Sequence, residues 1–183
     1  MHTPLRILSA DPGSTMMGLA ITEISPDFKT LTVVDATTVN LAKLLNRNEQ
    51  SRAELFGDKV TKLHILRQAV SKYAEAWEPL IAIAETPYKG RFAQAYAVLT
   101  ECYSAIRLGL YDHNPAMVLN GIDPSSVKAS VGVNGRSGDK ELMRAALLNL
   151  PDLVLTIPLV LLDEHAIDAI AVGYSYFRSQ VRP

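Results

Sequence analysis

Four side chains that can carry charge interrupt segments that are otherwise apolar. Asp11 and Glu85 each end a short apolar run, and His165 and Asp168 interrupt a third apolar segment. A carboxylate at the edge of a hydrophobic core is costly unless it is paired or holds a cation. Oxygen-rich groups that come from distant parts of the chain predict one site for a hard divalent cation, Mg²⁺ or Mn²⁺.

Two predicted strands and one predicted helix would position these groups. Residues 4–11 and 80–85 have the pattern of buried strands, and we expect them to lie adjacent and parallel, with their carboxylates side by side. His165 and Asp168 are three residues apart on a predicted helix, so they share one face of it. Two cations held in this way can activate water and stabilise the leaving oxygen in phosphodiester hydrolysis.

The remaining pattern predicts an α/β protein with a mixed five-stranded sheet, three antiparallel strands followed by two parallel ones, flanked by helices. We expect one domain over residues 1–183. The polar segment 41–58 is consistent with a short helix and a loop, and segment 151–162 has no clear assignment. The expected strands are 4–11, 16–24, 29–39, 80–85 and 115–120, and the expected helices are 59–77, 91–110, 124–131, 139–149 and 164–178.

Composition limits the function classes. The net charge is −1, so any contact with nucleic acid must use local basic patches. A single cysteine, Cys102, excludes an internal disulfide and fits a reducing compartment. No signal-peptide pattern opens the chain, and the longest apolar run, 153–162, is too short to span a bilayer. We therefore expect a cytoplasmic protein, of a bacterial cell or a phage-infected host, with no membrane contact.

At three segments the chain resembles the RuvC family of Holliday-junction resolvases, which belongs to the RNase H-like superfamily and has phage versions. The matching segments are 7–14 with Gly18, 81–85, and 165–170, and their order and spacing agree with the family. The resemblance implies a metal-dependent endonuclease that cuts four-way DNA junctions, leaving a 5′-phosphate and a 3′-hydroxyl. It implies that the catalytic, metal-binding quartet is Asp11, Glu85, His165 and Asp168.

The resemblance also implies how DNA and a second subunit would bind. Tyr88 falls where the family stacks an aromatic on a base, and helix 91–110 corresponds to the family's homodimer interface. Lysines at two matching positions would contact phosphates, and neighbouring cations would enlarge that basic surface. The residues of this expected DNA surface are Tyr88, Lys89, Arg91, Lys128, Arg136, Lys140 and Arg144.

Other readings of the same residues stay open. Asp-Pro-Gly alone is most often a turn, Tyr88 could pack under a loop, and surface lysines are usually only solvated. A non-catalytic junction-binding subunit could keep the fold without the chemistry. A nucleotide-binding protein of the actin and sugar-kinase type also begins with an Asp and Gly turn between strands, but this chain is short for that two-lobed fold.

Overall fold

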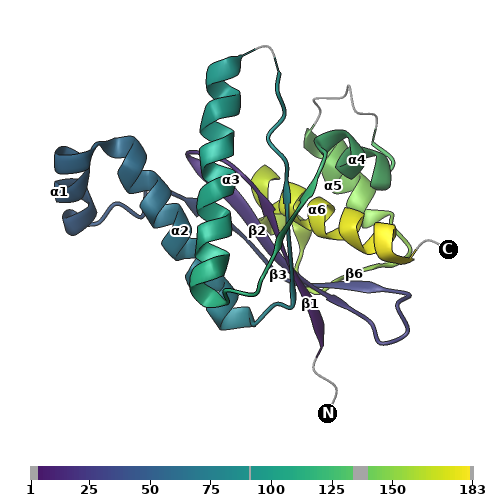
Figure 1. Ribbon diagram of the computed structural model, residues 1–183. Helices are drawn as coiled ribbons and strands as arrows, with labels where there is room; N and C mark the ends of the chain where they lie inside the picture. The colour runs from purple at the N-terminus through teal and green to yellow at the C-terminus, as the bar shows by residue number, and fades with distance from the viewer. Residues whose placement is uncertain (1–3, 91, 134–139, 182–183) are drawn as a thin grey trace.

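The computed structural model describes residues 4–90, 92–133 and 140–181 and, within them, shows one six-stranded mixed sheet with helices on both faces (Figure 1). The strand order across the sheet is β5-β4-β1-β2-β3-β6. The strands are β1 (Leu5–Asp11), β2 (Met16–Ile24), β3 (Leu31–Asn40), β4 (Ile81–Glu85), β5 (Leu119–Ile122) and β6 (Leu153–Leu155).

The first five strands confirm the predicted arrangement. β1, β2 and β3 form an antiparallel meander, β4 joins β1 in parallel, and β5 joins β4 in parallel. Successive side chains of a strand point to opposite faces. Ile7 and Leu8, neighbours in β1, accordingly belong to the two separate hydrophobic clusters, one on each face of the sheet.

The predicted number of strands was wrong by one. β6 pairs in parallel with β3 and lies in the segment that had no clear assignment, because three residues are too few for a strand pattern. β5 also begins later than predicted. Asn114 starts a turn in which the amide of Met117 donates to its carbonyl at 2.9 Å, so the strand cannot include residues 115–117.

Two helices cover one face of the sheet, and the last helix with two shorter ones covers the other (Figure 1). The segment 41–58 contains the expected short helix, α1, which is capped by Asn46 and has no buried residue. The helices are α1 (Arg47–Phe56), α2 (Asp58–Trp77), α3 (Ala93–His113), α4 (Pro124–Ser130), α5 (Lys140–Leu148) and α6 (Glu164–Val181), with a 3₁₀ turn, η1, at Leu159–Leu161.

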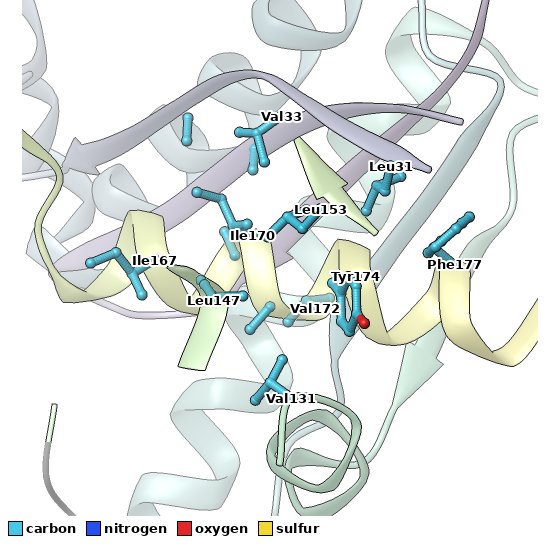
Figure 2. Close-up of a cluster of buried hydrophobic side chains, with 14 of the residues drawn as sticks. Leu31, Val33, Val131, Leu147, Leu153, Ile167, Ile170, Val172, Tyr174 and Phe177 are labelled. Atoms are coloured by element: carbon cyan, nitrogen blue, oxygen red, sulfur yellow. The ribbon is translucent and has the colours of Figure 1, made fainter. Parts of the chain in front are cut away.

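Helix α6 is the centre of the larger cluster. Figure 2 shows Ile167, Ile170 and Tyr174 of α6 among side chains from β3, β6 and α5. The helix lies close to the sheet at Gly173, where an added Cβ would lie 2.9 Å from Ser9 Oγ. This close packing holds the start of α6 in a defined place over the sheet.

Among the helices of the described residues, none is long and apolar enough to cross a membrane.

Candidate functional site

Asp11 and Glu85 are the last residues of neighbouring parallel strands. Ala10 of β1 pairs with Ala84 of β4. The residues that follow them, Asp11 and Glu85, therefore lie side by side at one edge of the sheet. The predicted adjacency of the two carboxylates is therefore a direct result of strand register. The Asp11 side chain is 17% exposed, which leaves its carboxylate close to both core and solvent.

His165 and Asp168 reach the same place from the first turns of α6. The helix begins at Glu164, and Asp163 caps it by accepting a hydrogen bond from the amide of Ala166 at 3.2 Å. The hydroxyl of Thr38 also donates to Asp163. Asp163 thus holds the start of the helix, and His165 and Asp168 follow it within the first turns, near Asp11.

A direct contact joins the helix to the sheet. His165 Nδ1 lies 2.9 Å from Asp11 Oδ2, although the two residues are 154 positions apart in sequence. The hydrogen bond to Asp11 raises the pKa of His165, against the opposing effect of burial. The other ring nitrogen, Nε2, lies 3.8 Å from Glu164 Oε1, so carboxylates face the imidazole on both sides.

Gly18 makes that contact possible. It pairs with Asp11 in the β1–β2 register, and α6 crosses directly above it. A Cβ added at Gly18 would lie only 1.8 Å from the carbonyl oxygen of His165. Any larger residue would therefore force the start of α6 away from the sheet.

The electrostatics of the cluster are those of crowded, partly buried acids. Burial, and then the charges of Asp11 and Asp168, raise the pKa of Glu85 to about 8. Burial, and then the charge of Asp11, raise the pKa of Asp168 to about 6. Lys128 on α4 opposes both shifts. Such perturbed acids at one edge of a sheet are typical of functional sites.

The chemistry of this cluster fits a hard divalent cation. Three carboxylates and one imidazole supply mainly oxygen ligands. No three His, Cys, Asp or Glu side chains in the described residues form a ready-made cage. The charge of Asp11 affects the pKa of both Glu85 and Asp168, and a bound cation would favour the ionised forms of these acids. Asp11, Glu85, His165 and Asp168 are the residues that could hold it.

A small hollow of about 130 Å³ opens beside the carboxylates, and we call it the site hollow. Tyr88, which follows β4 and is 68% exposed, forms one wall, and Leu99 of α3 forms another. Asp11 and Glu85 lie at its polar side. A flat aromatic ring and two carboxylates therefore face the same space.

Comparison with known proteins places this geometry in a familiar fold. No protein-family model and no curated protein matches the sequence. Among solved structures, Thermus thermophilus RuvC matches with a TM-score of 0.68 at 14% identity, covering 96% of this chain and 95% of that chain. The chain has the fold of RuvC-type Holliday-junction resolvases.

Two further structures support the RuvC fold. The yeast mitochondrial Holliday-junction resolvase Ydc2 matches with a TM-score of 0.63 at 13% identity, covering 96% of this chain and 78% of that chain. The fowlpox virus Holliday-junction resolvase matches with a TM-score of 0.53 at 13% identity, covering 96% and 99%. The RuvC fold therefore extends over nearly all of this chain.

The predicted DNA-contacting residues are placed unevenly around this RuvC-fold site. Tyr88 and Lys89 are exposed in the loop after β4, and Lys128 is close enough to influence Glu85 and Asp168. Arg144 bonds within the protein, to Glu141 at 2.8 Å and to the carbonyl of Leu162 at 3.0 Å. Lys140 is the first residue of α5.

Two of the predicted cations, Arg91 and Arg136, lie outside the described residues.

One acid near the site was missed from sequence. Asp123 follows the end of β5, so the neighbouring strands β5, β4 and β1 each end at, or are followed by, a carboxylate. The charge of Asp123 contributes to the raised pKa of Glu85. Its own carboxylate accepts from the amide of Ser125 at 2.8 Å and so caps α4. The signal was the capping sequence Asp123-Pro124-Ser125, which would have been visible had β5 been placed correctly.

Proposed function

We propose that this protein is a divalent-cation-dependent endonuclease that resolves four-way DNA junctions. The observation that carries the proposal is the meeting of Asp11, Glu85, His165 and Asp168 at one strand edge of a RuvC fold. T. thermophilus RuvC has been solved in complex with a Holliday-junction substrate, and the fowlpox resolvase in complex with junction DNA. We extend that substrate to the present chain.

The residues of the site have separate tasks in this proposal. Asp11 and Glu85, on rigid strand ends, hold the cation, and Asp168 completes the set from α6. A bound divalent cation supplies Lewis acidity at the phosphate and lowers the pKa of water. His165 is held through Nδ1 by Asp11, and its Nε2, which faces Glu164 at 3.8 Å, would accept or return a proton. Mg²⁺ is the expected ion, with Mn²⁺ able to replace it.

DNA and a second subunit would bind around this site. Tyr88, which lines the site hollow with the carboxylates, would stack on an unpaired base, and Lys89 and Lys128 would contact phosphates. Helix α3 exposes Tyr96, Leu108 and Tyr111, which supports its proposed role as a homodimer surface. A two-fold dimer would present two sites to the paired strands of a junction.

The test is cleavage of a labelled synthetic four-way junction and a matched linear duplex in Mg²⁺, Mn²⁺ and EDTA. We expect paired nicks on the junction in either metal, none in EDTA, and none on the duplex. Glu85→Gln and Asp168→Asn should bind the junction without cutting it, because each removes one anionic ligand and keeps the side-chain shape. Glu75→Gln, at an exposed position of α2, is the matched control and should cut normally.

The outcomes separate the alternatives. Junction binding without cleavage in any divalent cation would favour a non-catalytic junction-binding subunit. The absence of both binding and cleavage would refute the proposed substrate. Cleavage retained in Asp168→Asn would remove that residue from the proposed set.

A further inference from the structure

A second hollow, of about 250 Å³, lies next to the site hollow on the α2 side of the sheet, and we call it the α2 hollow. Two lysines from the first turns of α2, Lys59 and Lys62, form one wall. Ser14 and Thr15, in the turn between β1 and β2, also line it. The α2 hollow thus combines two ammonium groups and two hydroxyls with the carboxylates of Asp58 and Glu101.

The two hollows are neighbours on the same edge of the molecule. Ser14 follows Asp11 by three residues, so their Cα atoms are at most about 11 Å apart. On α3, Val98 lines the α2 hollow and the next residue, Leu99, lines the site hollow. A DNA strand bound across the carboxylates would therefore reach the α2 hollow within a few nucleotides.

Of the four donors in the α2 hollow, Lys62 and the two hydroxyls are not used by the protein itself, whereas Lys59 is paired. Within the described residues, the exposed hydroxyls of Ser14 and Thr15 have no hydrogen-bond partner, and half-buried Lys62 has no ion pair. Lys59 is held between the two oxygens of Glu101, at 2.8 and 2.7 Å. Because Glu101 already pairs with Lys59, Lys62 and the hydroxyls are the groups best able to bind an anion, and the carboxylate of Asp58, also in the lining, would oppose that binding.

We propose that the α2 hollow binds a backbone phosphate of the DNA strand that crosses the site, on the opposite side of the carboxylates from Lys128. Lys128 is on α4, which packs with α6, whereas Lys59 and Lys62 are on α2, which covers the other face (Figure 1). A phosphodiester accepts hydrogen bonds from both ammonium and hydroxyl groups and is recognised without regard to base. This inference rests on the proposed nuclease function. It adds the path of the bound strand, which would run from Lys128, across the carboxylates, to the α2 hollow.

The test measures binding of a fluorescently labelled four-way junction in EDTA at several salt concentrations, for wild type, Lys62→Gln and the double variant Ser14→Ala, Thr15→Val. Lys62→Gln, which removes one charge at the phosphate, should weaken junction binding about eightfold at 0.1 M salt and reduce the slope of log K against log salt by about 0.9. The double variant, which removes only neutral hydroxyls, should weaken binding without changing the slope. Lys72→Gln, an exposed lysine further along α2, is the control and should change neither quantity.

The possible results are distinct. A weaker affinity and a shallower salt slope in Lys62→Gln, with wild-type values in Lys72→Gln, support the phosphate site. Wild-type affinity and slope in both Lys62→Gln and the double variant, while the wild-type protein binds and cuts junctions, overturn the phosphate site alone. A wild-type protein that does not bind the junction overturns the proposed function and the phosphate site together. Thermal melting of each variant shows that it is folded.

Discussion

Replacing Glu85 with glutamine is expected to change how the stability of the protein depends on pH. Burial and the charges of Asp11 and Asp168 raise the pKa of Glu85 to about 8, against an ordinary value of 4.5. The folded protein therefore binds this proton more tightly than the unfolded chain does. The resulting stability is present below pH 4.5 and is lost as the pH rises toward 8.

The magnitude follows from the two pKa values. Between pH 5 and pH 8 the linkage relation gives a loss of roughly 3–4 kcal/mol in the free energy of unfolding from this group alone. For a domain of this size that loss corresponds to a fall of roughly 7–14 °C in the melting temperature. Glu85→Gln keeps the shape of the side chain but cannot ionise, so its melting temperature should fall much less over the same range.

The assay is thermal unfolding followed by circular dichroism in EDTA at half-unit steps from pH 5 to pH 8. Wild type and the exposed control Glu75→Gln should lose stability together, and Glu85→Gln should separate from them as the pH rises. Saturating Mg²⁺ should restore much of the loss in wild type, because a cation stabilises the ionised acids. Parallel curves for all three proteins in EDTA would refute the claim that Glu85 is a crowded, buried acid.

Three further perturbations test other parts of the structure. Gly18→Ala should destabilise the fold by about 1–3 kcal/mol and abolish junction cleavage, because its Cβ would meet the His165 carbonyl. Gly90→Ala is the control for both melting and cleavage, since its Cβ would lie 3.7 Å from the nearest atoms, those of the Tyr88 side chain. Phe177→Ala should cost about 3–5 kcal/mol in urea unfolding, since this ring is fully buried, and a loss below 1 kcal/mol would contradict that packing. Tyr88→Ala should leave the melting temperature unchanged but weaken junction binding by about 1–3 kcal/mol, and unchanged affinity would exclude stacking.

Much of the fold could be predicted because its central strands are buried and its helices are periodic. β1, β2 and β4 were predicted within a residue of their observed ends, and their adjacency followed from the pattern of apolar runs. β6 could not be predicted, because its three residues gain their strand conformation from pairing with β3. A short segment that depends on a distant partner carries little local signal.

The convergence of the four side chains was predictable from the sequence, but its geometry was not, and their catalytic and metal-binding role stays a prediction. The four side chains stood out because each interrupts an apolar segment. The contact between His165 and Asp11 was not predictable, because it depends on how closely α6 approaches β2, and that distance is set by Gly18 and Gly173. The Glu141 and Arg144 spacing of three residues on a predicted helix indicated an ion pair, whereas the second bond of Arg144, to the carbonyl of Leu162, depends on the fold and was not predictable.

The 154 residues between Asp11 and His165 have a consequence for the protein while it is being made. During synthesis β1, β2 and β4 emerge early and can pair, but they carry only two of the four side chains. His165 and Asp168 arrive with α6, after the six strands of the described residues have been synthesised. If the proposed function is correct, the sheet cannot cut DNA until α6 docks on it, so a partly folded chain has no nuclease activity.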